Sequence, residues 1–348
     1  TCDGQPPLPA EPPMNGEDAY WAALLAAAEL IRGGVVGFGD QYFFMADVGR
    51  AVLESGLRAN LAWCVFGGDG AEPGREIGGD IAEIAAFTET WHGAGQGRIK
   101  TAFGPHSAYV CAPLFLARTA AVAVRTCAGI RLRASESAEQ VDMSLLAYDM
   151  TPIEVLDKNG LLDMPVSLVN ATHLADHDLE ILAGRGTHVV ACPAAQVAAG
   201  IAVAPFARLL DAGVNVALGT DGAGLAGALD MFATLRETWR ALGGTRGAAA
   251  QALRLATEGG SRSLGFEDSG RLAPGYAADL IMIDARRPHL TPLHDPLLAL
   301  VTSVRASDVS DTVVGGEWLM RDGRLTMLDE ATILAEAAHR ASARGSGR

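Results

Sequence analysis

Positive charge is scarce in this sequence. Its 348 residues include 27 lysines and arginines against 41 aspartates and glutamates, which gives a formal net charge of −14. A surface of this sign repels the phosphates of nucleic acids and the headgroups of anionic lipids. We therefore expect neither nucleic acid nor a membrane surface among the partners of this protein.

Long apolar runs and paired cysteines are also missing. The longest purely apolar run spans residues 19–28, well short of the ~20 residues that a membrane-spanning helix needs. The cysteines form no C-x-x-C pair, which argues against a disulfide framework and against a cysteine zinc cluster. They are Cys2, Cys64, Cys111, Cys127 and Cys192. No secretory signal is visible, so we expect a cytoplasmic protein.

Two common catalytic motifs are absent as well. The sequence contains neither the phosphate-binding pattern G-x-x-x-x-G-K-[ST] nor the serine-hydrolase pattern G-x-S-x-G. Residues 222–227 do fit G-x-G-x-x-G. However, no second strand with an acidic end follows about 20 residues later, as a dinucleotide site requires. We therefore expect no nicotinamide cofactor.

What the sequence does have is a regular alternation of β-rich and helical segments within an apolar content of 49%. Candidate strands are residues 35–40, 59–66, 99–104, 130–134, 166–170, 188–192 and 214–220. Candidate helices are residues 17–32, 46–55, 76–91, 112–126, 138–158, 175–183 and 203–212. This alternation is typical of βαβ units in a parallel sheet. Seven consecutive units favour an α/β fold, a (β/α)8 TIM barrel whose first strand is apparently missing, over a doubly wound sheet.

The last third of the chain has a different texture. Two more helices are expected near 228–242 and 247–257, followed by short strands within 270–284 and 308–324 and a final helix at 328–343. We expect a TIM-barrel domain at 1–265, the C-terminal half of a small β-sandwich domain at 266–327, and a C-terminal helix and tail at 328–348. Because an open barrel edge is an aggregation hazard, we also expect a segment before Thr1 to supply the first strand.

Four short segments at the ends of predicted strands carry most of the information about function. They are GPHSAYVC (104–111), RASES (133–137), VNATHL (169–174) and LGTDG (218–222). In these segments the sequence resembles the amidohydrolase superfamily, specifically the chlorohydrolase/aminohydrolase branch that includes S-adenosylhomocysteine and methylthioadenosine deaminases. The resemblance runs from about Glu17 to Ala343. It implies a (β/α)8 barrel with a β-sandwich domain built from both chain ends.

The resemblance also implies a mononuclear Zn²⁺ or Fe²⁺ site. In that family an H-x-H pair on the first strand, a histidine on the fifth and an aspartate on the eighth bind the metal, which activates a water molecule. A fifth-strand glutamate and a sixth-strand histidine move protons. In this sequence Glu136 and Asp221 match the pattern, and His106 matches the substrate-side histidine of the fourth strand.

Three positions depart from the family pattern. Arg133 stands where the fifth strand carries its histidine ligand, and Asn170 stands where the sixth carries its proton-handling histidine. The seventh strand ends in A-C192-P instead of H-N-P. Arginine has no lone pair to offer a metal, so we predict that the zinc site is lost and that no cofactor is bound. Buried carboxylates need compensation, so we predict that Arg133 pairs with Glu136 and Asp221.

The predicted site residues fall into two groups, each with a plainer alternative. The predicted catalytic residues are Glu136, Asp221 and His106. The predicted substrate-binding residues are Arg133, Asn170, His173 and Cys192. As alternatives, the two carboxylates are inherited remnants, His106 caps the barrel rim, His173 caps a helix, and Cys192 is a packed small side chain.

Three functions remain open at this point. An ordinary zinc aminohydrolase is disfavoured by Arg133 and Asn170. The second is a divergent enzyme of the C–N hydrolase lineage, acting without the usual zinc on a small polar or anionic molecule that contains nitrogen. The third is a catalytically silent homologue that binds a small molecule or stabilises a partner, such as an active paralogue. We favour the second because Glu136, Asp221 and His106 are kept. The resemblance further implies a homodimer.

Overall fold

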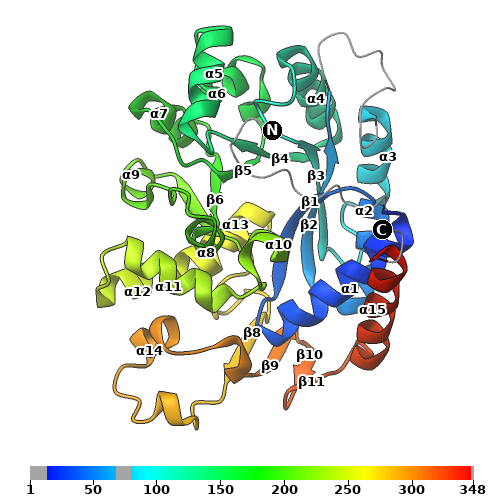
Figure 1. The fold of residues 1–348 in the computed structure, drawn as a ribbon, viewed down its shortest axis with the longest axis vertical. Coiled ribbons are helices and arrows are strands. Elements are labelled where there is room, and N and C mark those ends of the chain that lie inside the picture. The colour runs from blue at the N-terminus through cyan, green and yellow to red at the C-terminus, as the bar shows by residue number, and fades with distance from the viewer. Residues whose placement is uncertain (1–13, 68–79, 346–348) are drawn as a thin grey trace.

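The protein is described by a computed structural model that covers residues 14–67 and 80–345. Seven parallel strands form one curled sheet in which each strand pairs with the next along the chain (Figure 1). They are β1 (Gly37–Tyr42), β2 (Arg58–Val65), β3 (Ile99–Pro105), β4 (Gly129–Ala134), β5 (Val166–Asn170), β6 (His188–Ala191) and β7 (Asn215–Leu218). β1 and β7 are the two edges of this described sheet. The α/β TIM-barrel class is confirmed, and every predicted strand lies within two residues of an observed one.

Helices lie around the outside of the curled sheet (Figure 1). Those that precede or follow strands β1 to β6 are α1 (Gly16–Arg32), α2 (Met45–Ser55), α3 (Ile81–Trp91), α4 (Pro113–Thr126), α5 (Ala138–Tyr148), α6 (Pro152–Lys158), η1 (Leu161–Asp163), α7 (Asp176–Gly184), α8 (Pro193–Ala198) and α9 (Phe206–Asp211). Residues 76–79 of one predicted helix lie outside the described residues. No helix of the described chain is long and apolar enough to cross a membrane.

Two of the helix predictions were wrong in detail. The single helix expected at 138–158 is two helices. The first ends where Asp149 adopts a left-handed backbone, with φ of 55°, and the second begins at Pro152 under a cap from Thr151. Proline fits the first turn of a helix but not its interior, which explains the break. The short α8 after β6 was missed, although Pro193 at its first position marks a helix start.

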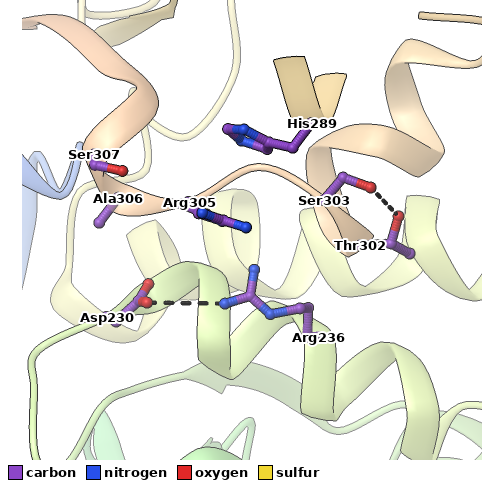
Figure 2. Close-up of a pocket in the computed structure, with 8 residues that line it drawn as sticks. All are labelled: Asp230, Arg236, His289, Thr302, Ser303, Arg305, Ala306 and Ser307. Carbon is purple, nitrogen blue, oxygen red and sulfur yellow. Dashed lines mark hydrogen bonds and ion pairs between the residues drawn. The ribbon is translucent and has the colours of Figure 1, made fainter. Parts of the chain in front are cut away.

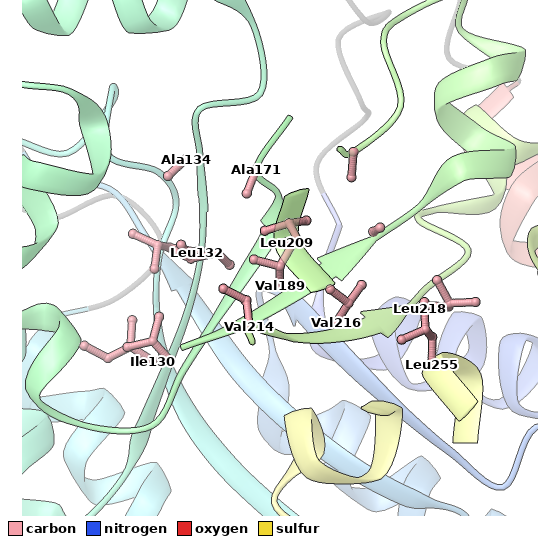
Figure 3. Close-up of a cluster of buried hydrophobic side chains, with 14 of the residues drawn as sticks. Ile130, Leu132, Ala134, Ala171, Val189, Leu209, Val214, Val216, Leu218 and Leu255 are labelled. Carbon is pink, nitrogen blue, oxygen red and sulfur yellow. The ribbon is translucent and has the colours of Figure 1, made fainter. Parts of the chain in front are cut away.

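The main core lies between the sheet and the helices outside it (Figure 3). On β4, Ile130, Leu132 and Ala134 are buried in this core. Successive side chains of a strand point to opposite faces, so Arg131 and Arg133 of the same strand point to the inside of the curl. The pattern of one strand therefore places two arginines within the barrel.

A helical segment closes the end of the barrel where the strands begin. It consists of η2 (Leu255–Gly259), a single π-helical turn, and α13 (Gly260–Leu264), and it follows α10 (Ala223–Ala226), α11 (Met231–Ala241) and α12 (Arg246–Arg254). The side-chain amide of Asn60 on β2 donates to the carbonyl of Leu264 at 3.2 Å, and Ser167 on β5 donates to that of Ser263 at 2.9 Å. With this end covered, the open end is the one where the strands finish.

A second, antiparallel sheet follows the barrel, as expected. Its order is β11-β10-β9-β8, with β8 (Leu280–Ile283), β9 (Val309–Val314), β10 (Glu317–Arg321) and β11 (Arg324–Leu325). The segments η3 (Pro288–Leu290), α14 (Pro296–Thr302) and η4 (Ala306–Asp308) lie between β8 and β9. The final helix, α15 (Glu330–Gly345), returns to α1 (Figure 1), where Arg340 contacts Asp18 at 3.1 Å. The domain boundaries at 265/266 and 327/328 stay predictions.

One ion pair fastens the small sheet to the barrel. Arg58 at the start of β2 contacts both carboxylate oxygens of Asp279, at 2.7 and 3.1 Å, and the Asp279 side chain is only 2% exposed. Burial alone would raise the pKa of Asp279, but the hydrogen bonds from Arg58, Ser269 and the backbone of Gly315 outweigh it and hold that pKa below its ordinary value. Asp279 therefore stays charged and fixes the junction.

Candidate functional site

One cavity of about 1960 Å³ is lined by the ends of the strands and extends to the start of β1, α1 and the second sheet. Parallel strands that pair in chain order finish at the same rim, so residues far apart in sequence meet there. All seven side chains predicted from the sequence line this cavity: His106, Arg133, Glu136, Asn170, His173, Cys192 and Asp221. The structure thus brings the predicted residues together, while their individual roles stay predictions.

Arg133 lies between two carboxylates in this cavity. Its Nη1 is 3.0 Å from Oε1 of Glu136, and its Nη2 is 3.4 Å from Oδ1 of Asp221. The carboxylate side chains are only 14% and 12% exposed. Burial by itself would lower the pKa of Arg133, but the charges of Glu136 and Asp221 outweigh burial and raise that pKa above its ordinary value. The guanidinium therefore stays charged and compensates both acids, in the pairing that the sequence predicted.

Glu136 is held by more than the arginine. The side-chain amide of Asn170 donates to its Oε1 at 2.9 Å, and the hydroxyl of Tyr109 lies 3.5 Å from its Oε2. The backbone N–H of Glu136 donates to Gln140 at 3.0 Å. These contacts fix one orientation of the carboxylate. Asn170 therefore acts on Glu136 as a hydrogen-bond donor.

His106 follows β3 and lies flat against Phe66, with ring centroids 4.7 Å apart and an interplanar angle of 23°. Its Nδ1 is 3.1 Å from the hydroxyl of Ser107. Burial, with a smaller contribution from the positive charge of Arg133, lowers the pKa of His106 to about 4. At neutral pH the ring is uncharged, so one ring nitrogen has a lone pair that accepts a hydrogen bond.

The two remaining predicted residues have weaker chemical roles. Cys192 is 3% exposed, and burial together with the charge of Asp221 raises the pKa of its thiol to about 12. A thiol in this state is a poor nucleophile, which favours a packing or contact role. His173 is half-buried, and its backbone N–H donates to Ser135 at 2.8 Å. The alternative of His173 as a helix cap is wrong, because Ala175 is the N-cap of α7.

Sequence reasoning missed Arg131, which lines the same cavity one inward position before Arg133 on β4. Arg131 is 4% exposed, and its Nε and Nη2 have no hydrogen-bond partner among the described residues. Burial lowers the pKa of Arg131 to about 10, against the opposing effect of Asp40. Burial likewise raises the pKa of Asp40. The sequence could have revealed Arg131, because side chains two residues apart on a strand point to the same face and Arg133 was already predicted to line the site.

Two further buried polar atoms in the cavity wall are unsatisfied within the described chain. They are Oδ1 of Asn170, a residue 4% exposed, and Oε1 of Gln196, a residue 2% exposed. Buried polar groups in proteins are almost always hydrogen-bonded. Both atoms are acceptors, so the wall is suited to a ligand that presents N–H or O–H groups.

Backbone strain gathers at the same rim. Ser135, Asn170, Ala171 and Asp221 all follow or end strands and have positive φ angles of 53°, 71°, 41° and 58°. Non-glycine residues in this region carry about 1–3 kcal/mol of strain each and persist where the surroundings over-determine them. The strain is consistent with a rim whose side-chain directions are set by the site.

The described residues do not fit the metal centre implied by the sequence resemblance. Within the ranges 14–67 and 80–345, no three histidine, cysteine, aspartate or glutamate side chains gather closely enough to hold a metal ion. Asp221, which the sequence resemblance matches to a metal-binding aspartate, is in contact with Arg133, whose guanidinium has no lone pair to donate. The charge that balances the two acids is here provided by a side chain.

Replacing Arg133 tests this charge balance. Arg133→Ala leaves two poorly exposed carboxylates without their cation, so we expect the free energy of unfolding to fall by about 3 kcal/mol, measured by urea denaturation. Arg185→Ala is the matched control, because Arg185 also bridges two carboxylates, Asp157 and Asp163, but is 42% exposed. The control should lose no more than about 1 kcal/mol. Equal losses in the two variants, or a loss below ~1 kcal/mol for Arg133→Ala, would contradict the assignment.

The same arginine also sets the protonation of His106. We expect NMR titration of the intact protein to give a pKa of about 4 for His106. Arg133→Gln should raise this value without bringing it to 6.5, because burial, the larger cause, remains. Arg185→Gln should leave it unchanged. A His106 that titrates near 6.5 in the unaltered protein would show that the ring is solvated and not buried as described.

Comparison with known proteins identifies the family of this chain. The profile of the amidohydrolase family matches residues 6–319. The 5-methylthioadenosine/S-adenosylhomocysteine deaminase of Pelotomaculum thermopropionicum is 37% identical over 339 residues, which cover 96% of this chain and 77% of that protein. The 5'-deoxyadenosine deaminase of Methanosarcina mazei is 36% identical over 334 residues, covering 94% and 76%.

Among solved structures, a zinc-bound adenosine deaminase from Xanthomonas campestris superimposes with a TM-score of 0.88 at 28% identity, covering 96% of this chain and 77% of its own. The atrazine chlorohydrolase of Arthrobacter aurescens, at 22% identity and a TM-score of 0.84, covers 94% and 77% and shares the fold. The deaminase relatives support the general function of hydrolysing C–N bonds. With its barrel, its retained acids and this likeness along nearly its whole length, the chain belongs to the amidohydrolase family.

Proposed function

We propose that this protein hydrolyses the exocyclic C–N bond of a small, nitrogen-containing ring compound of the adenine nucleoside type, and that it does so without the zinc of its relatives. The observation that carries the proposal is Arg133, a cation held between Glu136 and Asp221 beside a neutral His106. The names of the relatives support the substrate class, since they are deaminases of adenine nucleosides.

The retained residues suffice for the proton movements of a deamination. Water adds to the ring carbon that bears the amino group, loses a proton, and ammonia leaves after gaining one. In our proposal Glu136 accepts the proton of the water and returns it to the departing amine. In the proposal, neutral His106 accepts a hydrogen bond from an N–H group of the ring. Arg133 stabilises the negative charge that develops on the ring during attack, because a fixed cation in a partly buried site acts strongly on such charge.

The walls of the cavity suit a flat ring with N–H groups. The parallel rings of Phe66 and His106 offer an aromatic surface at the rim. The unsatisfied oxygens of Asn170 and Gln196 are acceptors for an amino group. Arg131 and Arg133 add positive charge, which favours a substrate with an electron-rich or anionic substituent. The cavity has a volume of about 1960 Å³, which leaves room for the sugar of a nucleoside beside its ring.

An ammonia-release assay with 5'-deoxyadenosine and 5'-methylthioadenosine tests the proposed activity. Glu136→Gln should lower kcat by about 100-fold or more, because removal of a general acid–base group typically has an effect of this order. Glu180→Gln, a change of the same type on the exposed face of α7, should leave kcat unchanged. Turnover that survives Glu136→Gln would remove Glu136 from the proposed role.

The same ammonia-release assay tests whether the activity depends on a metal. Prolonged treatment with a zinc chelator should leave the rate unchanged, and metal analysis of the purified protein should find less than one zinc per chain. A rate that falls on chelation and returns with added zinc would overturn the metal-independent part of the proposal. It would leave the C–N hydrolase activity in place.

A second function is favoured by one specific observation. Arg133 and Asn170, which the sequence resemblance matches to two histidine positions of the family, both contact Glu136. This arrangement also suits a catalytically silent homologue that binds a nucleoside or stabilises a paralogue. Binding of 5'-deoxyadenosine without ammonia release, together with co-purification of a paralogue, would identify this function. The homodimer and the cytoplasmic location stay predictions from the sequence.

A further inference from the structure

A second cavity, of about 580 Å³, lies away from the barrel mouth (Figure 2). It is formed between α11 and the segment that joins α14 to β9. The residues that line it are Asp230, Arg236, His289, Thr302, Ser303, Arg305, Ala306 and Ser307, and none of them lines the central cavity. Its volume is within the usual range of small-molecule sites, roughly 300–1,000 Å³.

Two arginines face this cavity, and neither makes a close ion pair with a carboxylate of the described residues. Arg305 is exposed, and its guanidinium has no carboxylate within ion-pair distance in the described part of the chain. Arg236 is 24% exposed; its Nη1 donates to the carbonyl of Val304 at 2.8 Å, and its Nη2 is 3.8 Å from Asp230. Asp230 is mainly the N-cap of α11, where it accepts from two backbone N–H groups. Asp230 therefore only partly neutralises the charge of Arg236.

Uncharged donors complete the lining. Ser303 and Ser307 carry hydroxyls, and the Ser303 hydroxyl lies 3.2 Å from that of Thr302. Nε2 of His289 lies 2.8 Å from Asp308, a residue 2% exposed that also accepts from the backbone of Arg305. His289 thus lies between the cavity and the buried carboxylate of Asp308. Figure 2 shows the two guanidiniums and the imidazole around the cavity, while the Ser303 hydroxyl is turned toward Thr302.

The charge of this cavity contrasts with that of the whole molecule. A protein of net charge −14 repels anions over most of its surface. Guanidinium groups match the oxygens of phosphate with parallel N–H donors, and charge-assisted hydrogen bonds of this type are the strong ones. Two guanidiniums with two hydroxyls offer more donors than a carboxylate has oxygens to receive. The donor set is therefore better matched to the oxygens of a phosphate group.

We propose that the cavity between α11 and residues 302–307 is a binding site for a phosphate group, either free phosphate or a small phosphomonoester. Arg305 and Arg236 provide the charge, and Ser303 and Ser307 donate hydroxyl hydrogen bonds. This site is separate from the barrel mouth, so the proposal does not depend on the catalytic function.

Calorimetric titration of the full chain with inorganic phosphate, at constant ionic strength and neutral pH, tests the site. We expect saturable binding of one phosphate per chain. Arg305→Gln should weaken it about tenfold, the equilibrium equivalent of one lost charge-assisted hydrogen bond. Arg125→Gln, which removes an exposed arginine of α4 on another side of the molecule (Figure 1), should leave the affinity within about twofold.

A second variant and a second ligand complete the test. Ser303→Asp places a carboxylate in the cavity and should abolish phosphate binding, while the melting temperature in phosphate-free buffer stays that of the unaltered protein. Glycerol 3-phosphate binding more tightly than inorganic phosphate identifies a phosphomonoester ligand, and the reverse identifies free phosphate. Absence of saturable binding of both ligands, or equal weakening by Arg305→Gln and Arg125→Gln, would refute the proposal.

Discussion

The constraint on which the rest of this structure depends is the pairing of each strand with the next one along the chain. Because all seven strands run parallel and in sequence order, their carboxyl ends meet at one rim. His106, Glu136 and Asp221 are separated by up to 115 residues in sequence (221 − 106), yet they line one cavity for this reason alone. The helical segment at residues 255–264 covers the end where the strands begin, and β1 and β7 are the two edges of the described sheet.

Within that rim, electrostatics organises the side chains. Glu136 and Asp221 are poorly exposed acids, and such groups persist as ions only beside compensating charge. Arg133 meets this need near the end of β4, and its charge adds to the burial that lowers the pKa of His106. Asn170 adds a neutral donor to Glu136. A single cation at this position therefore contacts both acids and adds to the effect of burial on the pKa of His106.

The sequence predicted the barrel and the rim well, because both follow from local patterns. The alternation of β-rich and helical segments predicted β4 and β5, strand ends of a barrel pointed to residues 133–136 and 170–173, and the family resemblance singled out Glu136 and Asn170. Arg131 escaped notice because a buried arginine in a strand reads as an interruption of the apolar pattern. The break between α5 and α6 was also missed, although Pro152 marks a helix start.

The smaller cavity shows a different limit of sequence reading. Asp230 and Arg236 belong to α11, His289 lies in η3 and Arg305 follows α14, and no spacing rule connects these three segments. They meet only because α11 packs against the segment after α14, which is a result of tertiary packing. A pattern-based reading detects a site when its residues share a strand or follow equivalent strands, as at the barrel rim.

Arg133 differs from a metal ion in one further respect. A metal is in exchange with the surrounding solution, so its occupancy varies with supply, with competing ions and with chelating metabolites. A guanidinium is attached to the backbone by covalent bonds and is present at unit occupancy in every folded copy. In this protein the cation that contacts Glu136 and Asp221 is therefore encoded in the sequence, and it is in place as soon as the chain has folded.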